Sequence, residues 1–216
     1  MSARVALVAG AVGRRSEALL NRVLGSGDYA GVVVLADAPM ALGVRALALA
    51  GPDELPRIDD AFLMLSDPDE AGSRSFYGRD APFVQVHEGN CLRVAQRAAA
   101  AGATRTLLVS PAPAWQQVGR FHSGLTNATE LAIAQLPFRA FVVLRPVQPA
   151  RRAAGNLLQR FAAAYISVQM LMMPRSLDVI TSEQLARCAL AAMRRAADGV
   201  RVFGAQQLPA LLEPGD

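Results

Sequence analysis

Two side chains in the middle of the chain have the types needed for proton transfer. Ser110 ends the apolar run TLLVS (106–110), and His122 stands in the following stretch FHSGLTNATE (121–130). An imidazole titrates at about pH 6.5, so it can exchange a proton at neutral pH without help from an ammonium group. Ser110 and His122 are therefore a candidate acid–base pair. The alternative is that His122 is a partly exposed residue at the start of a helix, with no chemical task.

A glycine-containing turn near the N-terminus has the features of an anion site. Residues 10–16 read GAVGRRS. Gly10 permits a tight turn, and Gly13, which follows Val12, lets the backbone approach a pyrophosphate. The small Ser16 lets the next helix pack closely on the strand, and the N–H groups at that helix's N-terminus can bind phosphates. The turn is predicted to bind a nucleotide or a related anion, and the alternative is a plain strand-to-helix turn.

Charged residues near this turn bear on which dinucleotide it would take. Asp37 ends the second predicted strand. A carboxylate there can accept hydrogen bonds from both ribose hydroxyls of NAD, and it repels the 2′-phosphate of NADP. Arg14 and Arg15 could each reach a phosphate or lie on the exposed face of the helix. These residues favour NAD slightly over NADP. The alternative for Asp37 is that it is a solvated acid at the end of a strand and binds no ribose.

Apolar runs alternate with longer segments that have helical spacing. Strands are predicted at 4–10, 31–37, 45–51, 59–66, 104–110, 139–146 and 200–204, with a short extended piece at 177–181. Helices are predicted near 14–25, 80–101, 153–173 and 182–197, and another opens in FHSGLTNATE. Strands that are apolar throughout and joined by helices indicate a parallel sheet covered on both faces. The predicted fold class is α/β, a doubly wound parallel sheet in a single domain, 1–216, to which residues 150–199 add a small C-terminal lobe on the substrate side.

Composition limits the function classes. The net charge of +4 comes without long basic runs or interleaved aromatic residues, which argues against nucleic-acid binding. The apolar stretch 161–173 is too short to span a bilayer, which needs about 20 residues, so no membrane span is expected. The two cysteines and two histidines have no metal-ligand spacing. We expect a cytoplasmic protein with reduced thiols that binds a dinucleotide or small molecule and self-associates through the 153–173 helix.

The order and spacing of several motifs resemble the short-chain dehydrogenase/reductase superfamily. The resemblance is closer still to its atypical group of small NAD(P)-binding, isomerase-like and Tat-interacting-protein-like proteins. The matching stretches are VALVAGAVG (5–13), AFLMLSDPDEAGS (61–73), LRVAQRAAAAGATRTLLVS (92–110), LRP (144–146) and GVRVFGAQQLPAL (199–211). The resemblance implies an NAD(P)-binding Rossmann-type fold and places Ser66, after the fourth strand, on the cofactor path. The acids at 67–70 would add negative charge near a pyrophosphate.

The family's catalytic set is altered in this chain. The family uses a Ser after the fifth strand and a Tyr-x-x-x-Lys pair on the next helix. The resemblance places Ser110 at the serine, His122 at the tyrosine and Thr126 at the lysine. The 22 Lys and Arg residues are all arginine, so no lysine is available anywhere to tune a tyrosine or hold the nicotinamide ribose. We therefore expect a catalytically impaired NAD(P)-binding protein that acts by ligand binding or partner interaction. The alternative is an active NAD(P)-dependent oxidoreductase that uses Ser110 and His122.

Overall fold

Seven parallel strands form the centre of the molecule. The computed structural model describes residues 4–38, 47–51, 55–66, 83–112, 124–147 and 180–212. The strands are β1 Val5–Ala9, β2 Gly31–Leu35, β3 Leu47–Ala50, β4 Asp60–Met64, β5 Arg105–Val109, β6 Ala140–Arg145 and β7 Gly199–Gly204. They form one sheet in the order β3-β2-β1-β4-β5-β6-β7. The predicted fold class is confirmed, because every pair of neighbouring strands is parallel.

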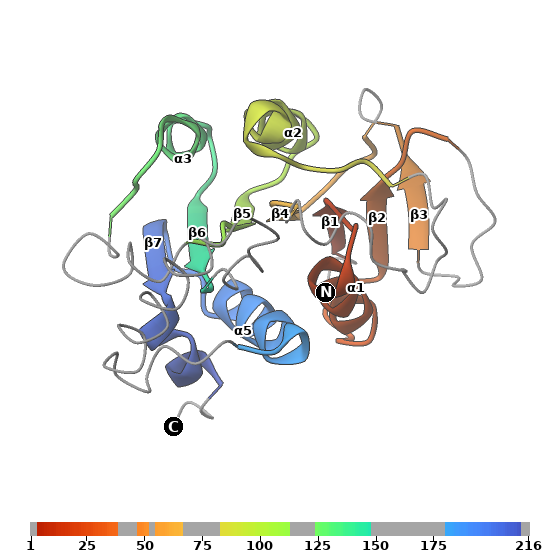
Figure 1. The fold of residues 1–216 in the computed structure, drawn as a ribbon. Coiled ribbons are helices and arrows are strands. Elements are labelled where there is room, and N and C mark those ends of the chain that lie inside the picture. Colours follow the sequence, from red (N-terminus) through yellow and green to blue (C-terminus); the bar gives the residue numbers. More distant parts are fainter. Residues whose placement is uncertain are drawn as a thin grey trace, which may run out of the picture.

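Helices cover both faces of the sheet (Figure 1). The helices are α1 Arg14–Leu24, α2 Glu88–Ala100, α3 Ala128–Ala134 and α5 Ser182–Arg194, followed by the 3-10 turns η4 Ala205–Gln207 and η5 Pro209–Leu211. α1 and α5 lie on one face, and α2 and α3 lie on the other. Because both faces are covered, β4 and β6 are buried along their whole length, and β1, β2 and β5 are buried at all but their first residue.

The core is divided into two layers by the sheet. On the α1/α5 face, Leu20 and Leu185 pack in one cluster with Phe62 of the sheet, and all three are almost fully buried. On the α2/α3 face, the alanines of α2 let that helix pack close to Leu63 and Leu108. The alternation of neighbouring strand residues between these two clusters is the period of two expected of a strand.

Two helices begin later than the sequence pattern predicts. The pattern places the start of α2 near residue 80, but the helix begins at Glu88, because residues 83–86 are extended and pair with strand ends instead. The helix expected to open in FHSGLTNATE begins only at Ala128, where the Asn127 side chain accepts a hydrogen bond from the N–H of Glu130. α5 begins at Ser182 as predicted, with Thr181 as its cap.

The predicted helix at 153–173 lies outside the described residues, as do three of the five residues of the short extended piece at 177–181. The described part of the predicted C-terminal lobe, from residue 180 onward, contains α5, which packs with α1 on the main sheet. The lobe and self-association therefore stay predictions. Among the described residues, no helix is long and apolar enough to cross a membrane.

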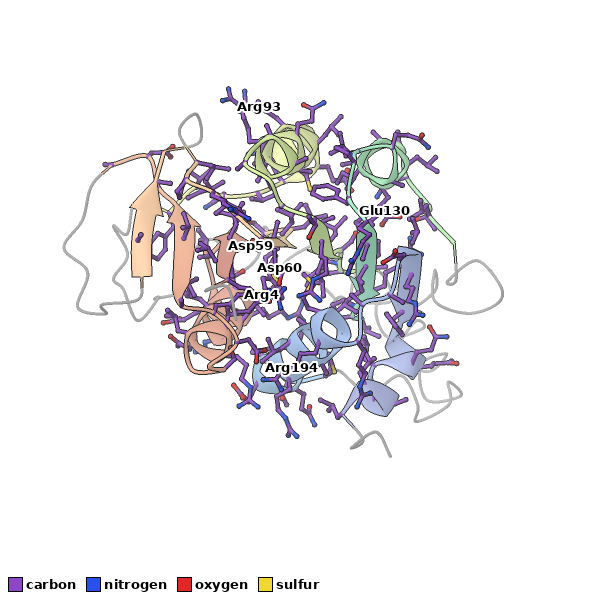
Figure 2. All side chains as sticks on the ribbon, turned by 180° about the vertical axis from the view of Figure 1, so that it is seen from behind. Arg4, Asp59, Asp60, Arg93, Glu130 and Arg194 are labelled. Atoms are coloured by element: carbon purple, nitrogen blue, oxygen red, sulfur yellow. The ribbon has the colours of Figure 1, made fainter. Side chains whose placement is uncertain are left out.

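A buried carboxylate joins several elements at the amino ends of the strands. Asp60, the first residue of β4, is completely buried and forms an ion pair with Arg4. Arg105, the first residue of β5, donates to both of its oxygens at 2.7 Å, and the Tyr29 hydroxyl donates at 2.7 Å. Arg105 also donates to the Met193 carbonyl of α5 at 3.1 Å. Figure 2 shows Arg4 and Asp60 together at the middle of the sheet.

Removing the charge of Asp60 should destabilise the fold strongly. We expect Asp60→Asn to lower the free energy of unfolding by about 3–5 kcal/mol, because Arg105 would remain nearly buried without its counter-charge. The matched control is Asp198→Asn, which breaks the exposed Arg139–Asp198 pair at 3.0 Å and should cost less than about 1 kcal/mol. Urea unfolding of both variants checks this, and equal costs would contradict it.

Candidate functional site

The chain leaves β1 through a turn that only glycine can make at two positions. Gly10 has φ of 80° and Gly13 has φ of 90°, both in the region that other residues rarely adopt. A Cβ atom on Gly10 would lie 2.2 Å from the Met64 carbonyl oxygen of β4. The N–H of Val12 donates to the Gly10 carbonyl at 2.7 Å, and Gly13 is the residue before α1. The turn therefore brings the N-terminus of α1 to the carboxyl edge of the sheet.

This turn lies where the order of strands along the sheet reverses. β1 is bordered by β2 on one side and by β4 on the other. From β1 the chain adds β2 and β3 towards one edge of the sheet, and it then adds β4 to β7 towards the other edge. In open parallel sheets, such a reversal leaves a ligand-binding crevice beyond the carboxyl ends of the two strands. Here the order reverses between β1 and β4, so a crevice of this kind would be bordered by Gly10 and Ser66, which follow these two strands.

The other predicted cofactor residues surround this position. Asp37 is exposed just beyond β2, and Arg14, the first residue of α1, is also exposed. Arg15 is buried, with 7% of its surface exposed, so it does not lie on the exposed face of α1. The hydroxyl oxygen of Ser66 is buried and has no hydrogen-bond partner within the part of the chain that the structure describes. Asp37 and Ser66 thus follow β2 and β4, and Arg14 begins α1.

The predicted catalytic residues are only partly placed. Ser110 follows β5 and is 8% exposed, and its N–H donates to the Leu144 carbonyl of β6 at 2.9 Å. Thr126 precedes α3, so it does not stand on a helix face as the predicted lysine position would. His122 lies outside the described residues, and so do the acids at 67–70. The pairing of Ser110 with His122 stays a prediction.

Sequence reasoning missed a buried ion pair next to these residues. Glu130 of α3 and Arg145 of β6 are almost fully buried, and their carboxylate oxygen and guanidinium nitrogen lie 2.6 Å apart. The same Glu130 oxygen accepts a hydrogen bond from the Thr126 N–H at 2.8 Å. The pair therefore fixes the backbone of Thr126 before α3 and joins that helix to the end of β6. The signal in the sequence was Arg145, the one charged residue in the otherwise apolar run AFVVLR.

The histidine and the cysteines outside this site have no evident chemical task. His87 is exposed and is the cap residue before α2. Cys91 and Cys188 are free and buried. Burial raises the pKa of the Cys91 thiol to about 12, helped by the negative charges of Glu130 and Glu88. Burial also raises the pKa of Cys188, to about 11. The described residues contain no group of three or more side chains that could hold a metal ion.

Two glycines with positive φ separate the cost of the backbone angle from the cost of close packing. Gly27 has φ of 72°, and a Cβ added there would meet no described atom within 4 Å, whereas a Cβ on Gly10 would meet the Met64 carbonyl at 2.2 Å. We expect Gly27→Ala to cost about 1 kcal/mol of unfolding free energy and Gly10→Ala about 3 kcal/mol or more. Denaturant unfolding measures both. If Gly10→Ala costs no more than Gly27→Ala, the close packing of the Met64 carbonyl against Gly10 does not contribute to the cost.

Comparisons with known proteins show similarity in structure but none in sequence. No protein-family model and no curated protein matches the sequence. The Bordetella bronchiseptica enzyme WbmH, solved in complex with NAD+, is similar in structure, with a TM-score of 0.50, 16% identity, and coverage of 93% of this chain and 76% of that chain.

Two further structures show lower similarity scores. An oxidoreductase of the short-chain dehydrogenase/reductase family from Burkholderia thailandensis has a TM-score of 0.48 and 17% identity, with coverage of 97% of this chain and 94% of that one. A short-chain dehydrogenase from Streptomyces avermitilis has a TM-score of 0.46 and 14% identity, with coverage of 98% and 91%. With its strand order and its similarity to WbmH, the chain has a doubly wound, Rossmann-type α/β fold.

Proposed function

We propose that this chain binds a nicotinamide dinucleotide in the crevice between the carboxyl ends of β1 and β4. The observation that carries the proposal is the pair of positive-φ glycines, Gly10 and Gly13, which lead from β1 into the N-terminus of α1. Backbone N–H groups at a helix N-terminus favour a pyrophosphate there. On the opposite wall, the buried hydroxyl of Ser66 has no partner among the described residues, so it is a polar group that a ligand would satisfy. The NAD+ bound to WbmH supports the same ligand class.

Different residues around the crevice would bind different parts of the dinucleotide. Val12, Gly13 and the first turn of α1 would hold the pyrophosphate, with Arg14 exposed beside them. Asp37, beyond β2, would accept hydrogen bonds from the adenosine ribose. When bound, a nicotinamide supplies hydride transfer. This chain's own residues would bind and orient it.

We propose further that ordinary dehydrogenase catalysis is impaired, and that the protein acts by binding its ligand or a partner. No lysine is present to hold the nicotinamide ribose. Thr126 carries no charge, so it does not lower a neighbour's pKa as a lysine would, and its short side chain does not reach a ribose as a lysine does. A cytoplasmic location and self-association through residues 153–173 belong to the same proposal.

One observation favours an alternative, an active oxidoreductase that uses Ser110 and His122. Ser110 follows β5, the neighbour of β4, so its hydroxyl belongs to the same edge of the sheet as the crevice. A serine there could polarise a substrate carbonyl by donating a hydrogen bond to it. His122 would have to supply the proton, since the chain has no Tyr-x-x-x-Lys pair.

Cofactor preference tests the binding proposal. We expect calorimetry to show weak binding, with NADH bound more tightly than NADPH, because Asp37 repels a 2′-phosphate. Asp37→Asn should weaken NADH binding roughly tenfold, since a hydrogen bond to a charged group contributes about 1.5–3 kcal/mol. Asp198→Asn, which removes one negative charge beside β7, should change neither affinity. NADPH bound tenfold more tightly than NADH would overturn the preference and assign the 2′-phosphate to Arg14 or Arg15.

Measurements of substrate turnover distinguish a catalytically impaired protein from an active oxidoreductase. With NADH or NADPH and a panel of carbonyl substrates, we expect wild type to be inactive. Restoring the family's pair by His122→Tyr with Thr126→Lys should produce activity if only the catalytic groups were lost, because positioned acid–base catalysis contributes about 10²–10⁴-fold. Turnover by wild type that His122→Ala abolishes, with the fold intact by circular dichroism, would establish the alternative instead.

A further inference from the structure

The carboxyl ends of β2 and β4 are joined by one extended segment, residues 83–86, which precedes α2. The Val84 N–H donates to the Leu35 carbonyl at the end of β2, at 2.9 Å. The Val86 carbonyl accepts from the N–H of Ser66, which follows β4, at 2.7 Å. Because β1 lies between β2 and β4, this segment connects the strand ends on both sides of β1.

The segment is itself held by the sheet and by α2. Val86 is fully buried, and its Cβ is 3.2 Å from the position of a Cβ on Gly10, so it packs against the glycine turn. The Asn90 amide of α2 donates to the Gln85 carbonyl at 2.9 Å, and the Asn90 side-chain oxygen accepts from the His87 N–H at 2.9 Å. The ends of β1, β2 and β4 are therefore fixed relative to one another.

The groups proposed to bind the adenosine diphosphate half of the dinucleotide come from these fixed strand ends. Asp37 is exposed and directly follows Ala36, which forms an antiparallel bridge with Phe83. Ser66 follows β4, and Gly13 leads from β1 into α1. Groups that are in place before the ligand arrives cost less ordering entropy on binding. This half of the site is therefore pre-organised.

The groups at the ends of β5 and β6 are neutral or already paired. Arg145, the last residue of β6, lies 2.6 Å from Glu130, and both side chains are almost fully buried, so this cation is neutralised inside the protein. Ser110 and Thr126 carry no charge, and the sequence contains no lysine. Hydrogen bonds between neutral groups contribute less than those that involve a charge. These described residues therefore offer the nicotinamide half only weak contacts.

We propose that this protein recognises the adenosine diphosphate part of its ligand, whether or not a nicotinamide is attached, an inference that rests on the proposed function. The ligand class is then nucleotides that contain an ADP-ribose group. The pre-organised ends of β1, β2 and β4 supply the affinity. The two oxidation states of the cofactor differ only in the nicotinamide ring, so NAD+ and NADH should bind equally well. The protein would then respond to the nucleotide concentration and not to its redox state.

Calorimetry with the separate halves of the cofactor tests this proposal. ADP-ribose is NAD+ without its nicotinamide, and nicotinamide mononucleotide lacks the adenosine half. We expect the dissociation constants of ADP-ribose, NAD+ and NADH to agree within about fivefold, and nicotinamide mononucleotide to bind at least a hundredfold more weakly. NADH bound more than fivefold more tightly than ADP-ribose would overturn the inference and leave the binding proposal intact. If NADH, NADPH and ADP-ribose all fail to bind, the binding proposal itself fails, and this inference with it.

Two matched substitutions test the pre-organisation. Asn90 and Gln184 are both the third residue of a helix, and the side-chain oxygen of each accepts a hydrogen bond from the backbone N–H of the cap residue. Only Asn90 also donates to residues 83–86. Asn90→Ala should weaken ADP-ribose and NADH binding by the same factor, about threefold to tenfold, because it removes one hydrogen bond that positions the strand ends.

Gln184→Ala should leave both affinities unchanged, although urea unfolding should show a similar loss of stability for the two variants, because each loses a helix-capping hydrogen bond. Unchanged affinities in Asn90→Ala would overturn the pre-organisation on which the inference depends. A loss of NADH binding without a loss of ADP-ribose binding would overturn it as well, because the nicotinamide half would then depend on these strand ends.

Discussion

The buried carboxylate of Asp60 is the contact on which the alignment of the sheet depends. Asp60 is in register with Ala6 of β1 and with Arg105 of β5, and Arg105 is the residue that binds both of its oxygens. A slip of one residue between strands would turn every side chain to the opposite face. It would also leave this charge buried without its partners. Burial raises the pKa of Asp60, and its contacts with Tyr29 and Arg4 oppose that shift. The charged network therefore favours one register.

That register fixes the opposite edge of the sheet. β4 and β5 start and end level with each other, and β1 starts and ends only one residue earlier, with Ala6 opposite Asp60. Gly10, Ser66 and Ser110 therefore come from neighbouring strands at a similar height, although 100 positions separate the first from the last. The close approach of Gly10 to the Met64 carbonyl is possible only in this alignment. Ion pairs at the amino ends thus determine the geometry of the proposed site at the carboxyl ends.

The sequence is sufficient to predict the seven strands, their parallel arrangement and the glycine turn, because these depend on local apolar patterns and on backbone angles that only glycine adopts. It is insufficient where a contact joins distant residues. Asp60 reads as an ordinary strand-end acid until Arg4 and Arg105, 56 and 45 positions away, are brought to it. Glu130 and Arg145 are closer in sequence, but their pairing requires α3 to lie over β6. The sequence pattern predicts helix over residues 83–86 because their apolar side chains fit either period, and pairing with the ends of β2 and β4 decides in favour of the extended form.

The packing of α1 against α5 has a consequence for the order in which the chain can fold. The two helices share one core cluster, and Arg194 at the end of α5 holds Asp28, which is 166 positions earlier in the chain. At typical rates of synthesis, the ribosome needs roughly ten to thirty seconds to make the chain between them. During that interval the apolar face of α1, with Leu19, Leu20 and Val23, lacks the cover that α5 gives it. Until α5 emerges, this face of the nascent chain is therefore open to non-native contacts.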